Sequence, residues 1–161
     1  MSEFRTGVGY DLHRLEQGRK LILGGVEIPH HKGLAGHSDA DVVAHAVTDA
    51  LLGAAGLGDI GEHFPPSDLK WKDVSSLVFL QHARELLARN GYAIVNVDVA
   101  IVIEQPKILP HRTRICESLA RALGVEISAI SLKAKTAEGL GPVGQQEAAW
   151  AIAVASIRRD R

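Results

Sequence analysis

Two stretches of the 161-residue chain alternate with a period of two, and they limit the folds that the chain can adopt. Branched apolar residues hold one parity from Val95 to Ile103, and Trp150, Ile152 and Val154 alternate with alanines near the end. This alternation predicts two strands, each with one face packed against the rest of the protein. A helix over the alanine-rich end would fit propensity alone, but the period of two favours a strand.

Glycine, proline and capping residues divide the rest of the chain. Gly24–Gly25 between two short apolar runs predicts a tight hairpin, and Ser38 is expected as the N-cap of a long helix. Strands are predicted at 7–15, 92–104 and 130–136, helices at 38–56, 75–90 and 110–124, and a long loop at 58–73. Strands and helices alternate without a strict βαβ series. We therefore expect a single α+β domain over residues 1–161, with a mostly antiparallel sheet and helices packed on one face.

Charge and cysteine content narrow the partners and the compartment. The chain has 18 basic and 19 acidic residues, and no basic stripe, which argues against nucleic acid or a membrane surface as the main partner. It has no run of 18 apolar residues, and the first residues, 1–9, lead us to expect no signal or transit segment. The single cysteine, Cys116, excludes an intrachain disulfide and is expected to be a small packed residue on a helix. We expect a cytoplasmic protein.

Three residues form a candidate metal site. Asp11 and His13 are two positions apart on an expected strand, so their side chains point to the same side, and His45 lies on the long helix. One carboxylate and two imidazoles are a typical ligand set for catalytic zinc, with a position left open for substrate. A chance Asp-x-His pair and an ordinary helical histidine fit the same residues, so spacing alone leaves both interpretations open.

Other candidates suit phosphate binding. His37 and Ser38 lie at the expected helix start, where exposed N–H groups attract anions, although Ser38 is also a plain N-cap. Polar residues in the long loop and at strand ends are further candidates: Asp59, Lys107, Lys133, Lys135, Thr136 and Glu138. Each also fits an ordinary turn residue or a solvated surface charge.

Several runs resemble the 2-C-methyl-D-erythritol 2,4-cyclodiphosphate synthase family, in the same order along nearly the whole chain. They are Gly9–His13, Leu23–Pro29, Lys32–Asp41, His45–Gly53, Gly58–Gly61, Asn96–Asp98, Pro106–Lys107, Leu109–His111, Lys133–Thr136 and Glu138–Gly141. The resemblance implies a ferredoxin-like fold assembled as a homotrimer, with active sites between subunits. The alanine-lined final strand suits packing at such an interface.

The resemblance also implies a reaction and its cofactors. The family converts 4-diphosphocytidyl-2-C-methyl-D-erythritol 2-phosphate to the 2,4-cyclodiphosphate and CMP, a step of non-mevalonate isoprenoid biosynthesis. Asp11, His13 and His45 match the ligands of Zn²⁺ or another divalent transition metal. Glu138 matches the residue that holds Mg²⁺ or Mn²⁺ on the substrate diphosphate.

Other positions match groups that contact the substrate. His37 and Thr136 match residues credited with transition-state stabilisation. The full set of expected substrate-binding residues is Asp11, His13, His37, Ser38, Asp59, Ile60, Gly61, Phe64, Asp68, Ile103, Lys107, Ile108, Leu109, Ala134, Lys135, Thr136, Glu138, Pro142 and Gln145.

The chain departs from the family pattern at a few positions. Pro65–Pro66 replaces a common Pro–Asp, Lys135 stands where Thr is frequent, and Pro142 replaces a frequent aromatic residue. Gln145 replaces an arginine near the trimer axis, so we expect a weak or absent diphosphate site there. Two other functions use the same residues: a metal-dependent phosphohydrolase, and a trimeric nucleotide-binding module without catalysis.

Overall fold

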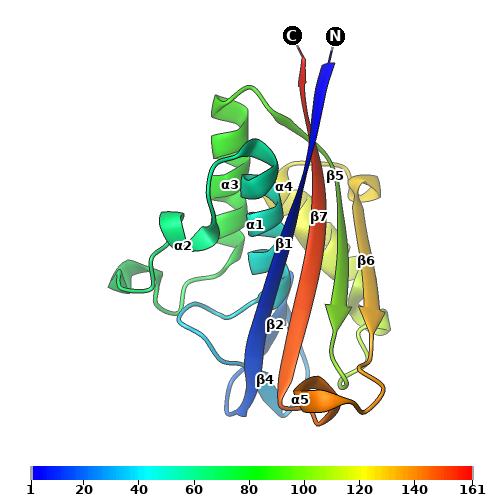
Figure 1. The fold of residues 1–161 in the computed structure, drawn as a ribbon. Helices are drawn as coiled ribbons and strands as arrows, with labels where there is room; N and C mark the ends of the chain where they lie inside the picture. Colours follow the sequence, from blue (N-terminus) through cyan, green and yellow to red (C-terminus); the bar gives the residue numbers. More distant parts are fainter. Residues whose placement is uncertain (1, 161) are drawn as a thin grey trace.

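The computed structural model describes residues 2–160 and arranges them as one main sheet, a small hairpin and a layer of helices (Figure 1). The strands are β1 (Ser2–Gln17), β2 (Leu21–Leu23), β3 (Val26–Ile28), β4 (Lys32–Leu34), β5 (Ala93–Val102), β6 (Ile130–Lys135) and β7 (Ala148–Asp160). The helices are α1 (Val42–Ala55), α2 (Ile60–His63), α3 (Leu77–Arg89), α4 (Arg112–Leu123) and α5 (Gly141–Gly144), with 3-10 turns η1 (Leu69–Trp71), η2 (Leu109–His111) and η3 (Ile127–Ala129). The prediction of a single α+β domain is confirmed, and so are the Gly24–Gly25 hairpin and the final strand.

The main sheet is mixed, so the prediction of a mostly antiparallel sheet was wrong. Its strand order is β4-β1-β7-β5-β6, and the edge pair β5–β6 runs parallel. Helix α4 connects β5 to β6 and carries the chain back to the end of the sheet where β5 begins. Strand β6 therefore runs parallel to β5. The ferredoxin-like description and the trimer stay predictions.

The long pair β1–β7 forms the centre of the sheet, and α1 packs directly on it. A Cβ atom on Gly9 would lie 1.9 Å from the carbonyl oxygen of Ala46, so only glycine permits this approach of strand and helix. The alternating alanines of β7 face α1 and are fully buried: Ala149, Ala151, Ala153 and Ala155. They are therefore packed within the chain, which corrects the interpretation that they line a subunit interface.

The opposite face of the sheet is open in the isolated chain and largely apolar. Its exposed side chains come from β1, β5 and β7 and include Phe4, Val8, Tyr10, Leu12, Val95, Ile152 and Val154. Apolar patches of this kind mark interaction surfaces.

Helix α1 begins later than expected, because its N-cap is Asp41 and not Ser38. The fully buried Asp41 carboxylate accepts hydrogen bonds from the N–H groups of Val43 and Ala44 and also from Gly24 and Gly25 of the hairpin. Burial, together with the nearby charge of Asp39, raises the pKa of Asp41 to about 6, although these backbone donors oppose the shift.

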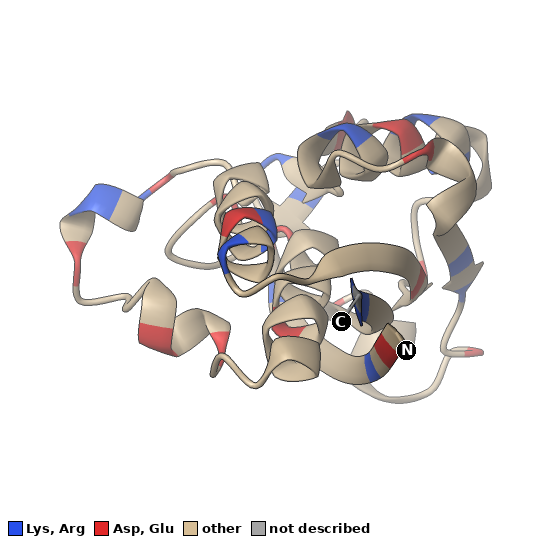
Figure 2. Ribbon diagram, turned by 90° about the horizontal axis from the view of Figure 1, so that it is seen from above, with Lys and Arg blue, Asp and Glu red and all other residues tan. Residues whose placement is uncertain are grey.

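Within residues 2–160, no helix combines the length and apolar character that a bilayer crossing requires. Acidic and basic residues are interspersed over the ribbon (Figure 2).

Candidate metal centre and substrate pocket

The three predicted metal ligands meet in the structure. Asp11 and His13 lie on the face of β1 that packs on α1, and His45 lies on α1. Asp11 Oδ2 lies 2.8 Å from His13 Nε2 and 2.9 Å from His45 Nδ1, and the two nitrogens are 3.2 Å apart. The site therefore presents one oxygen and two nitrogens in a nearly equilateral triangle.

This triangle fits a divalent metal ion. Bonds of 2.0–2.1 Å in a tetrahedral site place neighbouring donors about 3.3 Å apart, slightly more than these three edges. Among the described residues, these three are the group of acidic, histidine or cysteine side chains close enough to share one ion. Oxygen and imidazole donors suit zinc and other transition metals, and three protein ligands leave a fourth position open.

The electrostatics of the group favour a positive charge between its three side chains. Burial opposes the charge on Asp11, but hydrogen bonds and the charges of His13 and His45 outweigh it and lower the pKa of Asp11 well below its usual range. Burial opposes the charge on His13, but its contacts with Asp11 outweigh burial and raise the His13 pKa, so a metal ion at the triangle has to displace a proton from His13. A carboxylate that stays ionised is the form that binds metal.

The distal ring nitrogens are held as well. His13 Nδ1 lies 2.8 Å from the carbonyl oxygen of Ala35, which accepts its proton and leaves Nε2 free for a metal. His45 Nε2 lies 2.8 Å from Ser76 Oγ and 3.2 Å from Ser38 Oγ. Hydrogen bonds to the ring nitrogens that point away from the triangle therefore hold both imidazole rings in place.

A pocket with a volume of about 290 Å³ opens at the triangle. Besides the ligands, it is lined by five expected substrate-binding residues: His37, Ser38, Ile60, Gly61 and Phe64. The structure therefore brings together predicted residues of the Lys32–Asp41 run and of the 58–73 loop.

The expected anion seat at the helix start is not formed as predicted. Asp41 occupies the free N–H groups of the first turn of α1, so these donors are not available to a phosphate. His37 and Ser38 still line the pocket, five and four residues before the first residue of α1. The buried Ser38 hydroxyl accepts from the N–H of Ala40.

Aromatic residues form a wall of this pocket that sequence reasoning missed in part. Phe64 was expected, but Trp71 and Phe79 were not, and the three rings pack with centroids 4.3–5.9 Å apart. Because Phe, Tyr and Trp make up only 4% of the chain, the presence of three of them within residues 64–79 was the sequence signal that could have predicted this wall. The rings form an apolar wall beside the ligands, with the ring centroids of Phe79 and His45 5.8 Å apart.

The 58–73 loop is partly helical. It contains α2 and η1, whose N-caps are Asp59 and Asp68. Asp59 accepts from the N–H of Glu62, so its capping role is certain whatever else it binds. Asp68 is paired with Lys70, which lowers the Asp68 pKa, and its carbonyl oxygen lies 3.4 Å from His37 Nε2.

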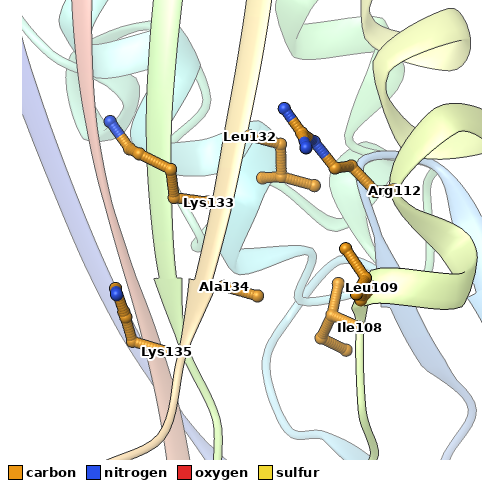
Figure 3. A pocket seen from close by; sticks show the side chains of 7 residues that line it. All are labelled: Ile108, Leu109, Arg112, Leu132, Lys133, Ala134 and Lys135. Carbon is orange, nitrogen blue, oxygen red and sulfur yellow. The ribbon is translucent and has the colours of Figure 1, made fainter.

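The second group of predicted residues lies where β5 and β6 end. Two adjoining hollows of about 340 and 160 Å³ share Ile108, Leu109, Ala134 and Lys135. The smaller one adds Ile103, Lys107 and Thr136. In Figure 3, Lys135 points away from Ile108 and Leu109, toward the other side of β6.

The remaining predicted residues follow β6. Glu138 Oε1 accepts from Thr136 Oγ1 at 2.7 Å, and Glu138 is exposed. Pro142 lines a separate hollow of about 310 Å³ with Leu12 and Arg14, and Gln145 is exposed at the end of α5. Cys116 is buried on α4, as expected, and burial raises the pKa of its thiol.

The two groups are separate within one chain. The pocket at the metal triangle is lined by none of the described residues of the β5–β6 group. The register runs from Asp11 on β1 to Ala151 on β7, Ile101 on β5 and Ala134 on β6. Three strand spacings amount to about 14 Å.

The sequence and the fold are both shared with known proteins. A model described as the YgbB family matches residues 4–158, which include the metal triangle and both groups of pocket residues. The chain belongs to the YgbB family.

Close relatives of this YgbB member include two named 2-C-methyl-D-erythritol 2,4-cyclodiphosphate synthase. One, from Solibacter usitatus, is 55% identical over 159 residues, which cover 99% of this chain and 100% of the relative. The other, from Gloeobacter violaceus, is 59% identical over 143 residues, which cover 89% of this chain and 88% of the relative. A solved structure of IspF from Plasmodium falciparum in complex with CDP superposes with a TM-score of 0.86 at 35% identity, covering 98% of this chain and 97% of that one.

Proposed function

We propose that this chain is a cyclodiphosphate synthase over residues 1–161. It converts 4-diphosphocytidyl-2-C-methyl-D-erythritol 2-phosphate to 2-C-methyl-D-erythritol 2,4-cyclodiphosphate and CMP, in non-mevalonate isoprenoid biosynthesis. As a cyclisation that expels CMP, the reaction is that of a phosphorus–oxygen lyase. The observation that carries the proposal is the triangle of Asp11, His13 and His45 in the lining of a pocket, in a chain that aligns over 159 residues with a named synthase.

The chain contributes mainly positioning to this reaction. The 2-phosphate of the substrate is its own nucleophile, so no side chain has to attack, and the barrier falls when the two phosphates are held in line. A divalent cation at the triangle, which we assign as Zn²⁺ or a similar transition metal, supplies positive charge beside the reacting phosphate. His37 donates to a phosphate oxygen, and the wall of Phe64, Trp71 and Phe79 excludes water.

The β5–β6 group is assigned to the cytidine end of the substrate. Its hollows are lined by apolar residues together with basic residues that include Arg112 and Lys107, and this lining suits a pyrimidine next to a diphosphate. The CDP complex of a structural relative supports a cytidine nucleotide as the ligand class. Thr136 and Glu138 lie at the diphosphate end, and Glu138 would hold Mg²⁺ or Mn²⁺ on the phosphates.

We infer a homotrimer with the active site shared between subunits. The inference is based on the distance between the metal triangle and the β5–β6 group. A substrate that must contact both would bind to the metal triangle of one subunit and to the β5–β6 group of a neighbouring subunit. The open apolar face of β1, β5 and β7 supports the assembly, because such a surface is stabilised by burial against other copies.

The β5–α4–β6 crossover beside β7 and β1 supports the ferredoxin-like description. A cytoplasmic location suits the single buried cysteine.

The test is incubation with authentic substrate and Mg²⁺, followed by phosphorus NMR. We expect stoichiometric CMP and cyclic diphosphate, formed about a hundredfold more slowly, or slower still, by His45→Ala. Release of inorganic phosphate with CDP-methylerythritol would contradict the cyclase and support a phosphohydrolase. Tight nucleotide binding without turnover under any divalent metal would support a binding module.

A further inference from the structure

We propose that Asp39 and Ser76 form a hydrogen-bonded relay that fixes the His45 ring in its metal-binding state. The two are positioning residues that act through His45. Neither of them lines the pocket at the metal triangle. The inference rests on the proposed metal centre and adds two residues to it.

The relay runs outward from His45 in two steps. His45 Nε2 lies 2.8 Å from Ser76 Oγ, and Ser76 Oγ in turn contacts Asp39 Oδ1 closely. The second oxygen of Asp39 accepts from the backbone N–H of Ser76 at 3.0 Å. Ser76 is fully buried, so its hydroxyl has no water to use instead.

The Ser76 hydroxyl takes no part in capping α3. Ser76 precedes the helix with helical backbone angles, φ −65° and ψ −10°, whereas a capping serine has an extended backbone. It makes no capping hydrogen bond, so its hydroxyl is available to His45 and Asp39. The neighbouring Ser75 accepts from the N–H of Leu77 at 3.4 Å instead.

The chemistry of the partners sets the direction of each hydrogen bond. An ionised carboxylate only accepts, so Ser76 must donate its proton to Asp39. The Ser76 oxygen then accepts the Nε2 proton of His45, which leaves the Nδ1 lone pair directed at Asp11 and His13. A histidine binds metal through an unprotonated nitrogen, and a partner on the other nitrogen sets which one that is.

Asp39 is itself held firmly at the junction of two elements. Its Oδ1 accepts from the N–H of Asp41, and its own N–H donates to the carbonyl oxygen of Val74. The relay therefore joins the start of α1 to the start of α3. Ser38 Oγ, at 3.2 Å from His45 Nε2, is a second and longer acceptor for the same proton.

Asp39→Asn is the sharpest test, because it keeps the shape and changes only the donors. An amide can accept through one atom only. If its NH₂ group faces the Ser76 hydroxyl, the Ser76 proton turns toward His45 and favours the wrong His45 tautomer. If the NH₂ group faces the backbone N–H of Ser76 instead, two hydrogen-bond donors oppose each other. We expect zinc affinity to fall by about 10- to 100-fold. Ser76→Ala should cost less, because Ser38 can still accept the proton.

Asp73→Asn is the matched control. Asp73 lines the same hollow of about 470 Å³ as Asp39 and loses the same charge, but it has no place in the relay. Zinc dissociation constants are measured by competition with a chromophoric chelator, and the melting temperature of the metal-free protein is recorded in parallel. A purely structural role would lower the melting temperature and leave the zinc affinity of the folded protein unchanged.

The outcomes separate the relay from the centre on which it depends. Weaker zinc binding in Asp39→Asn and Ser76→Ala, with Asp73→Asn like wild type, supports the relay. If wild type binds zinc and both relay variants bind it within twofold, the relay is refuted while the metal centre stands. If wild type binds no divalent metal, the metal centre itself is refuted. Should Asp39→Asn fail to fold, Ser76→Ala alone decides.

Discussion

The Nε2 atom of His13 lies 3.2 Å from the Nδ1 atom of His45, although the two residues are 32 positions apart and belong to a strand and a helix. Two imidazole nitrogens with lone pairs at this distance repel each other unless a proton or a cation lies between them. The Asp11 carboxylate contacts both rings and adds negative charge at the same point. The helix α1 and the strand β1 are therefore arranged for a positive ion.

His45→Ala should abolish metal binding and lower turnover by about a hundredfold or more, since it removes one of three ligands. The fold should persist, because α1 is held by its apolar residues and by Asp41. Metal content by mass spectrometry and far-ultraviolet circular dichroism check both statements. His31→Ala, on the surface, is the control; a full equivalent of zinc in the His45 variant would refute the ligand assignment.

Glu138→Gln should raise the Mg²⁺ concentration needed for half-maximal activity by about tenfold, because a neutral amide is a weaker ligand for a hard cation. Zinc content should not change, because Glu138 lies outside the metal triangle. A magnesium titration of initial rates gives the answer. Glu117→Gln removes an exposed charge from α4 and should have no effect; an identical magnesium dependence in the two variants would exclude Glu138.

Gly9→Ala should destabilise the protein by about 1–3 kcal/mol and weaken zinc binding, because the new methyl would meet the Ala46 carbonyl and push α1 away from β1. The matched variant is Gly53→Ala on α1, where a Cβ atom would have its nearest neighbour, the carbonyl oxygen of Val8, at 3.9 Å. It should stabilise α1 by about 0.5–1 kcal/mol. Urea unfolding and zinc titration of both variants test the pair. Equal effects would mean that the strand and helix are not in tight contact at Gly9.

Mixed trimers should recover activity that neither parent has. His45→Ala disables the metal half, and a Lys107→Ala, Thr136→Ala double variant disables the nucleotide half. If each site joins two subunits, random assembly of equal amounts restores about a quarter of the sites. Activity is measured after joint refolding, with separately refolded and then mixed proteins as the control. No recovery would place the whole site within one subunit.

Local patterns were enough to predict several parts of the fold and the site. Asp11 and His13 share a face because any strand puts alternate residues together, and Gly24–Gly25 specifies its hairpin wherever the hairpin packs. The period of two at the end of the chain identified β7 against its helical propensity. In each of these cases the local structure is predicted by residues that lie within a few positions of one another in the sequence.

Other features depend on distant parts of the chain. Ser38 was the expected N-cap of α1, but Asp41, which is held by the hairpin, is the N-cap in the structure. The parallel β5–β6 pair depends on where α4 delivers the chain. Trp71 and Phe79 join the pocket from a loop and a helix, where no periodicity marks them as neighbours.

The carboxylate of Asp41 has a consequence for how the protein opens. It binds amides of the β2–β3 hairpin and of α1 at once, so detaching either element would leave a buried charge short of donors. Hairpin and helix therefore belong to one cooperative unfolding unit despite their separation in the chain. Hydrogen exchange at Gly24 and Gly25 should then proceed with the same opening free energy as at Val43 and Ala44. A short, partly exposed hairpin would thus be as slow to exchange as the helix at the centre of the core.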